Sequence, residues 1–230
     1  MSAAGSPVEG GKLATGEERT GIDKRRLILD AAVRVFARQG FHACRVSDIA
    51  DEAGVAYGLV YHYFASKDEV LDTLFLERWN VMLDVIRDVD SKPIPVREKF
   101  GVIASFIVDS YRHDPDLMKV IIVEVTRAAN SFGQTHLAEI RAAYELIGDI
   151  VTEAQAQGSF RPEIEPRFAA MAFYGAIEQL LTGWIFGLLP EGPEHFERAK
   201  WLVVETVCGG LEQAAGPQPP SEQARPRSGQ

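Results

Sequence analysis

Apolar residues recur at three- and four-residue spacing through most of the chain, as they do on the buried face of an α-helix. The first such stripe comprises Leu27, Ile28, Ala31, Ala32, Val35 and Phe36. It ends before Gly40, which can adopt the left-handed conformation that closes a helix, and it predicts a helix over residues 24–39. Because no segment alternates apolar and polar residues as a half-buried strand does, the pattern predicts an all-α fold.

Helix-capping residues predict three further helices in the N-terminal third of the chain. Ser47 can cap a short second helix that ends at Gly54, and a third short helix fits residues 57–64. Ser66 and Glu69 have the spacing of a capping box, which predicts the start of a fourth, longer helix.

Prolines and glycines divide the remainder of the chain into longer helices. The strongest amphipathic pattern runs from Leu137 to Ala154 and ends before Gly158. Further helices are predicted over residues 96–113, 115–128, 165–189 and 193–213.

The two ends of the chain differ from this pattern. Residues 1–22 and 214–230 contain few large apolar side chains, so they bury too little apolar surface to offset the entropy cost of ordering. We expect a disordered arm and a disordered tail. Between them we expect a small domain over residues 23–68 and a larger helical domain over residues 69–213.

The charge of the chain is unevenly distributed. The formal net charge of −9 disfavours nucleic acid as a partner when it is taken alone. Residues 23–68, however, carry a net charge of +1, whereas residues 69–230 carry −9. An acidic C-terminal segment joined to a near-neutral N-terminal segment is compatible with DNA binding by the N-terminal segment only.

Cysteine and histidine usage argues against several other classes of protein. Cys44 and Cys208 lie far apart in a chain without a secretory signal pattern, so we expect a reducing, cytoplasmic compartment. The five histidines are scattered without the spacing of a metal site, and no catalytic motif is visible. We therefore expect neither an enzyme nor a bound cofactor.

The segment VSDIADEAGVAYGLVYHYFASKD, residues 46–68, has the features of a helix-turn-helix. Two short helices that cross need a small residue at the crossing and a glycine where the chain reverses, and Ala50 and Gly54 occupy these positions. Ile49, Val55 and Val60 supply the apolar contacts between the helices. The second helix then exposes its first residues, which can enter a major groove of DNA.

This segment resembles the DNA-binding segment of the tetracycline-repressor (TetR) family, and the likeness covers residues 24–72. The resemblance implies a dimer that binds a palindromic operator through an N-terminal three-helix domain. It assigns base reading to Tyr57, Gly58 and Leu59. It assigns phosphate and groove contacts to Tyr61, His62, Tyr63 and Lys67.

The chain departs from the family pattern beside the second helix. Arg45 stands where the family usually has a threonine, and it adds a predicted phosphate contact; Ser47 completes the predicted DNA-binding set. Leu59 replaces a frequent hydroxyl residue and can meet a thymine methyl group. The operator sequence therefore does not follow from the relatives.

The C-terminal part resembles the family members that regulate fatty-acid degradation and respond to acyl-coenzyme A (acyl-CoA). The resemblance implies a small-molecule effector, here a long-chain acyl-CoA, in an apolar tunnel. The predicted lining residues are Phe106, Val123, Phe132, Tyr144, Phe173 and Trp184. The arginines predicted to meet the coenzyme A phosphates are Arg112, Arg127 and Arg141.

In this family the last two helices pair across a twofold axis as a four-helix bundle. Small residues that permit close approach there are Gly175, Ala176 and Gly183. The partner stripe on the last helix comprises Phe196, Leu202, Val203, Val207 and Leu211.

Two alternative functions remain open at this point, and one segment has to be distinguished from a membrane span. An efflux-type repressor of hydrophobic cations would use buried carboxylates such as Glu124 or Glu178. A helical protein-interaction module would not bind an operator. The apolar segment 168–189 has the length of a membrane span, but it contains Glu178 near its middle, which favours burial within protein over lipid.

Overall fold

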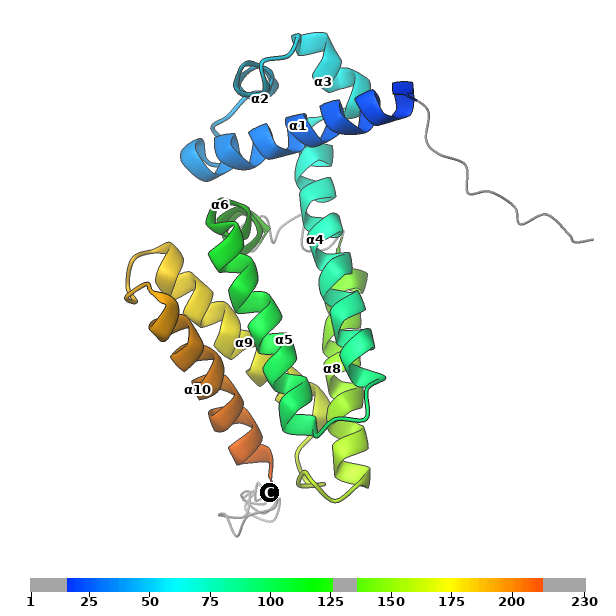
Figure 1. The fold of residues 1–230 in the computed structure, drawn as a ribbon, viewed down its shortest axis with the longest axis vertical. Coiled ribbons are helices and arrows are strands. Elements are labelled where there is room, and N and C mark those ends of the chain that lie inside the picture. Colours follow the sequence, from blue (N-terminus) through cyan, green and yellow to red (C-terminus); the bar gives the residue numbers. More distant parts are fainter. Residues whose placement is uncertain (1–15, 126–135, 213–230) are drawn as a thin grey trace, which may run out of the picture. The chain divides into compact units, whose positions relative to one another are not determined.

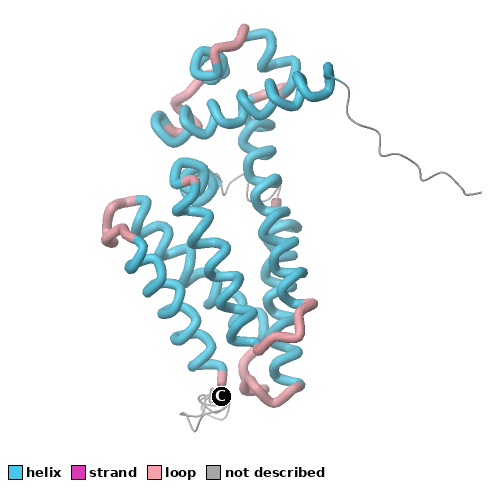
Figure 2. Tube along the Cα trace, in the orientation of Figure 1, coloured by secondary structure: helices cyan, strands magenta, loops and turns pink. Residues whose placement is uncertain are grey.

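The computed structural model describes residues 16–125 and 136–212, and the regular elements in these ranges are helices (Figures 1 and 2). The first four are α1 (Gly16–Gln39), α2 (Val46–Ala53), α3 (Tyr57–Tyr63) and α4 (Lys67–Asp90). The others are α5 (Val96–His113), α6 (Pro115–Lys119), the π-helical segment η1 (Val120–Val125), α8 (Leu137–Ala156), α9 (Pro166–Ile185) and α10 (Pro193–Leu211). The predicted all-α fold is confirmed.

Three helices differ from the prediction by more than two residues at an end. The helix predicted over residues 165–189 ends at Ile185. The first helix begins at Gly16, so residues 16–22 are helical although the sequence indicated a disordered arm there. Extending an existing helix adds one hydrogen bond for each residue fixed, which requires no buried apolar face. The helix predicted over residues 115–128 is a short α-helix that continues as η1 up to Val125.

The chain forms two compact units, which are described separately. The first unit contains residues 1–79 and 114–133, and the second contains residues 80–113 and 134–230. Helix α4 contributes to both. Packing therefore divides the chain differently from the predicted boundary after residue 68, because α6 and η1 return to pack against α1.

Helix α1 is the central element of the first unit, and it is buried on two faces. The predicted stripe, from Ile28 to Phe36, is buried, although Leu27 at its start is exposed. A second buried row comprises Leu29, Val33 and Ala37. The α2 helix packs on α1, as do α6 and η1, and the Lys119 ammonium donates a 2.7 Å hydrogen bond to the Ala37 carbonyl at the end of α1.

The second unit is a helical bundle in which α9 packs against α5, α8 and α10 (Figure 1). Two aromatic clusters fill its core. Phe100 meets the Phe160 and Phe173 rings edge to face, at centroid distances of 6.1 and 4.6 Å. In the other cluster, the ring of Tyr111 stacks on Trp184 at 5.7 Å, and Phe196 packs edge to face on Trp184 at 4.8 Å.

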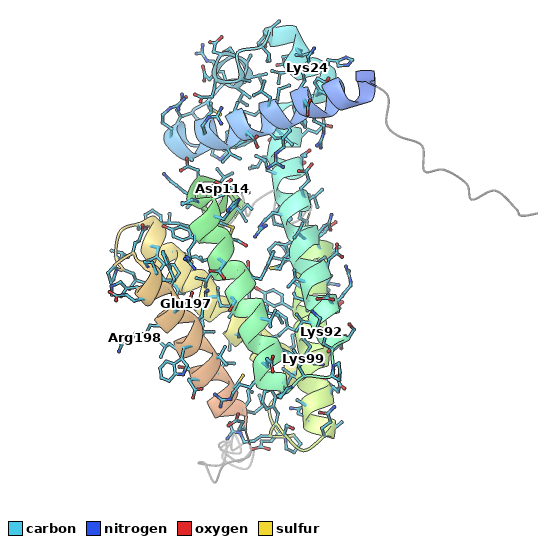
Figure 3. The ribbon with its side chains drawn as sticks, viewed as in Figure 1. Lys24, Lys92, Lys99, Asp114, Glu197 and Arg198 are labelled. Carbon is cyan, nitrogen blue, oxygen red and sulfur yellow. The ribbon has the colours of Figure 1, made fainter. Side chains whose placement is uncertain are left out.

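The two buried lysines of the second unit are paired. The Lys99 ammonium donates to the Asp90 carboxylate at 3.0 Å, near the loop between α4 and α5 (Figure 3). The Lys200 ammonium donates to the carboxylates of Asp109 and Glu197, each at 2.8 Å. Within the described ranges, no helix combines the length and the hydropathy needed to cross a membrane.

Candidate nucleic-acid interface

Backbone geometry sets the angle between α2 and α3. Gly54 ends α2 with φ +65° and ψ 34°, the left-handed conformation that the turn requires. Its neighbour Val55 donates a 3.0 Å hydrogen bond to the Ala50 carbonyl. Ala50, Ile49 and Val60 are buried between the helices, as predicted, while Val55 is half-buried.

The start of α2 differs from the prediction. The N-cap is Arg45 and not Ser47, and the Arg45 amide donates a 2.7 Å hydrogen bond to the Asp48 carboxylate. Ser47 lies within the first turn and is half-buried, whereas the Arg45 side chain is exposed. Arg45 is therefore available to a partner molecule, as the phosphate prediction requires.

Glu52 joins α2 to α1. Its carboxylate accepts a 2.7 Å hydrogen bond from Arg34 and a 3.0 Å hydrogen bond from Arg38. These two hydrogen bonds, to Arg34 first and then Arg38, hold the pKa of Glu52 below its ordinary value. Arg34 and Arg38 thus hold α2 to α1 through Glu52, while the buried residues of α2 pack in the core.

Helix α3 presents two tyrosines outward. Tyr57 and Tyr61 are 53% and 45% exposed, their rings lie edge to face at 5.1 Å, and the Tyr57 hydroxyl donates to the Tyr61 hydroxyl at 3.2 Å. That hydrogen bond raises the pKa of Tyr57. Gly58 lies between them with open space around its α-carbon, which permits close approach by a partner.

The remaining predicted contacts on α3 fall on its flanks. His62 is exposed and meets the half-buried Tyr63 ring edge to face at 5.0 Å, and Leu59 is half-buried. Phe64, which follows α3, is buried. The predicted DNA-binding side chains of α3 are thus placed together on one short helix, with Val60 as the anchor to the core.

Lys67 has an internal role that the sequence did not indicate. Its ammonium donates hydrogen bonds to the carbonyls of Phe41 and Cys44, at 2.6 and 2.8 Å, and lies 3.4 Å from the His42 carbonyl. It also lies 4.6 Å from the centre of the Phe41 ring. Because an ammonium has three donors, a phosphate would have to displace one of these carbonyls.

The N-terminus of α4 is capped nearly as predicted. The Ser66 hydroxyl accepts a 3.1 Å hydrogen bond from the Glu69 amide, which is half of the predicted capping box. The Glu69 carboxylate accepts from the Ala65 amide at 2.5 Å and not from the amide of Ser66. With Lys67 between them, these contacts tie the start of α4 to the helix-turn-helix.

The predicted effector-lining residues divide into core and surface positions. Phe173 and Trp184 belong to the aromatic clusters of the core, and Phe173 has no accessible surface. A side chain without accessible surface does not line an open cavity of the free protein, so we correct the assignment of Phe173 to packing. Trp184 retains some accessible surface and lines a pocket together with Leu180 and Leu202, so its assignment stays a prediction. Phe106 and Tyr144 are half-buried in the second unit, whereas the half-buried Val123 lies on η1 in the first unit.

The predicted coenzyme A arginines also differ from one another. Arg112 donates to the Asp109 carboxylate at 2.9 Å and lies 3.4 Å from Glu197, so its charge is already compensated. Arg141 is exposed on α8. Arg127 and Phe132 lie outside the described residues.

The predicted dimer stripe needs a larger correction. Gly183, Phe196, Val203 and Leu211 are buried within the protomer, and the Cβ position of Gly183 lies only 2.6 Å from Leu189. Gly175, Ala176 and Val207 are half-buried, and Leu202 is exposed. The large apolar side chains that α9 and α10 expose are instead Phe168, Met171 and Trp201, together with Leu202, and Phe186 and Leu188 follow α9.

A polar cluster between α8 and α9 was only partly indicated by the sequence. Tyr144 on α8 meets Tyr174 on α9 edge to face at 5.7 Å. Glu178 lies one turn after Tyr174, and burial raises its pKa. Burial, and then the Glu178 charge, raise the pKa of both tyrosines. We call Tyr144, Tyr174 and Glu178 the α8–α9 polar cluster.

Two family models match the chain. The model of the bacterial regulatory proteins of the tetR family matches residues 28–74, which include α2 and α3. The model of the YsiA-like protein C-terminal region matches residues 75–188. Together they cover more than half of the chain.

Individual relatives are regulators of transcription. The chain is 30% identical to a fatty acid metabolism regulator protein of Bacillus subtilis, over 69% of this chain and 81% of that protein. It is 31% identical to the HTH-type transcriptional repressor KstR2 of Mycobacterium tuberculosis, over 82% and 92%. The fold matches that of the transcriptional regulator FadR of Bacillus subtilis in complex with stearoyl-CoA, with a TM-score of 0.73, 25% identity and coverage of 81% and 99%.

These relatives fit a DNA-binding regulator better than an efflux-type repressor or an interaction module. The helix-turn-helix geometry of α2 and α3 agrees with this assignment. The chain belongs to the TetR family of bacterial transcriptional regulators.

Proposed function

We propose that this protein represses transcription by binding a palindromic operator as a dimer, and that a long-chain acyl-CoA releases it. One observation carries the effector assignment. The chain matches a fatty acid metabolism regulator over 81% of that protein, far beyond the helix-turn-helix that all family members share. The likeness to FadR bound to stearoyl-CoA supports the same class of effector.

The exposed face of α3 supports the operator contact. The exposed hydroxyl groups of Tyr57 and Tyr61 bond to each other and are also open to a partner, so each can meet a phosphate oxygen. Arg45 is exposed at the start of the adjacent helix. Phosphate contacts release counterions, so operator affinity falls steeply as the salt concentration rises.

The exposed apolar residues of α9 and α10 support a dimer. Phe168 and Trp201 are 70% and 60% exposed, which is unusual for side chains of this size on a monomer. A twofold axis brings the same surface of each protomer together. Replacing Trp201 with aspartate should therefore weaken the dimer in analytical ultracentrifugation, while Phe196→Ala should mainly destabilise the fold.

Arg141 supports the contact to the effector, because it is exposed on α8 of the second unit. Arg112 is the matched control, because its guanidinium already pairs with Asp109 and Glu197. Arg141→Ala should weaken acyl-CoA binding by about tenfold if it meets a phosphate, which corresponds to about 1.4 kcal/mol. Arg112→Ala should leave acyl-CoA affinity nearly unchanged.

The experiment that tests the proposal begins with the DNA that co-purifies with the protein. Sequencing it identifies the operator, and fluorescence anisotropy of a labelled operator then measures binding. Stearoyl-CoA should release the operator, whereas stearate or free coenzyme A should release much less. Tyr61→Ala should weaken operator binding at every salt concentration. Release by none of these compounds, with release by a hydrophobic cation, would overturn the effector assignment.

A further inference from the structure

Most lysine and arginine side chains described in the first unit already have a partner within the protein. Carboxylates pair with the described arginine side chains of α1, which are Arg25, Arg26, Arg34 and Arg38. Backbone carbonyls accept hydrogen bonds from the ammonium groups of Lys67 and Lys119. Arg78 is half-buried and interacts with Asp114. These cations are therefore occupied before any DNA binds.

Lys24 and Arg45 are the exceptions. Both side chains are exposed, and within the described part of the first unit neither has a carboxylate partner. A paired cation has to give up its partner to meet a phosphate, whereas an exposed and unpaired cation exchanges only water and counterions. Arg45 already belongs to the predicted DNA-binding set. Lys24 is an additional cation that is available to a polyanion.

Lys24 lies near the edge of the helix-turn-helix. It is one turn before the fully buried Ile28, so it lies on the same face of α1 as the start of the buried stripe. Its neighbour Arg25 pairs with Glu77 on α4, and the Arg25 guanidinium lies 5.5 Å from the centre of the Phe64 ring, directly after α3. These two contacts hold this part of α1 against the end of α3. Figure 3 shows Lys24 on the side of α1 that faces α3.

We infer that Lys24 contacts a backbone phosphate of the operator, so that each protomer holds the DNA with a cation from α1 as well as with Arg45. The inference rests on the proposed operator binding and adds a residue to it. The family model that matches the N-terminal part begins at residue 28, so that match assigns no role to Lys24. Because a phosphate contact carries no sequence information, Lys24 strengthens binding to the operator and to unrelated DNA alike.

The test measures the salt dependence of operator binding by the full-length protein, using fluorescence anisotropy of the co-purified operator. Each phosphate contact contributes about 0.9 to the slope of log affinity against log salt concentration. The dimer carries two copies of Lys24, so Lys24→Gln should reduce the slope by about two. Operator affinity should fall by about tenfold at low salt and by less at high salt. Lys24→Arg keeps the charge and should keep the slope of the wild type.

Arg26→Gln is the matched control. It removes the same charge from the same turn of α1, but the Arg26 guanidinium is paired with Asp30 at 2.9 Å. Its slope should therefore stay close to that of the wild type, and any change measures the effect of net charge alone. Urea unfolding should show that Lys24→Gln is as stable as the wild type, because the exposed Lys24 side chain makes no contact that holds the fold.

Each other outcome overturns a defined part of the account. An unchanged slope and affinity for Lys24→Gln, while Tyr61→Ala weakens binding, overturns the inference and leaves the proposed function in place. Equal reductions of the slope by Lys24→Gln and Arg26→Gln also overturn the inference, because the effect is then one of net charge and not of a contact. If the wild-type protein binds no DNA that co-purifies with it, the proposed function itself is wrong.

Discussion

Two tyrosines of α3 are exposed to solvent, whereas the aromatic side chains in the core of the second unit are buried and pack against one another. On α3, Tyr57 and Tyr61 project outward, while the helix is held by Gly54 and by the anchor Val60. In the second unit, ring contacts such as that of Phe173 with Phe100 hold the helices to one another. Changes to the first group should therefore affect binding with little effect on stability, and changes to the second group should do the reverse.

The largest expected effect comes from Phe173→Ala. Truncating a fully buried phenylalanine leaves a cavity and typically costs about 3–5 kcal/mol of unfolding free energy. Tyr61→Ala, on an exposed face, should change stability by about 0.5 kcal/mol or less. Urea unfolding measures both. If Phe173→Ala instead kept its stability and lost acyl-CoA affinity, Phe173 would line the effector site as the sequence suggested.

Lys67→Met should have the next largest effect. It removes two short hydrogen bonds from a charged donor to the carbonyls of Phe41 and Cys44, and such a bond contributes about 1.5–3 kcal/mol. Operator affinity should fall because the α1–α2 turn loses its support, while the dependence of affinity on salt should stay the same. A salt slope reduced by about one, with unchanged stability, would instead support the direct phosphate contact.

The two glycines of the helix-turn-helix form a matched pair. Gly54→Ala should cost about 1 kcal/mol, because its left-handed backbone disfavours any β-carbon although the surrounding space is open. Gly58 lies in a helix, so Gly58→Ala should be neutral or stabilising by up to about 1 kcal/mol. Gly58→Ala should nevertheless weaken operator binding. Unchanged binding would show that the DNA does not approach this part of α3.

The smallest expected effect is the pH dependence from Glu52. Its pKa is lower in the folded protein, so its contribution to stability is present above the ordinary glutamate pKa and is lost as the pH falls through the folded pKa. Glu52→Gln should therefore reduce the loss of stability on acidification below about pH 4.5, the ordinary value. Thermal unfolding of both proteins across that range makes the comparison. Identical pH profiles would show that the Arg34–Glu52–Arg38 contacts do not stabilise the fold.

Local signals in the sequence predicted the helices well. Gly40, Gly54 and Gly158 each have positive φ and lie at helix ends, as their positions in the pattern indicated. The helix-turn-helix was predictable for the same reason, because its geometry depends on a few adjacent residues. The cap of α2 was not, since Arg45 caps through its backbone amide and that amide is common to nearly all residue types.

Contacts between distant segments were not predictable. Helices α9 and α10 are apolar on more than one face, and the pattern does not indicate which face packs within the protomer. This is why Phe196, Val203 and Leu211 were assigned to the dimer although they are buried in the protomer, and why the exposure of Phe168 and Trp201 was not predicted. Similarly, nothing near Lys67 in the sequence indicates its contacts with the turn after α1.

The most direct test of the account is the affinity for stearoyl-CoA with and without the operator. Coupling between two binding sites is reciprocal, so an effector that releases the operator must itself bind more weakly to the operator complex, by the same factor. Calorimetry should show this weakening, with a factor equal to the loss of operator affinity that saturating stearoyl-CoA causes. Equal stearoyl-CoA affinity for the free protein and for the operator complex would contradict acyl-CoA control of DNA binding.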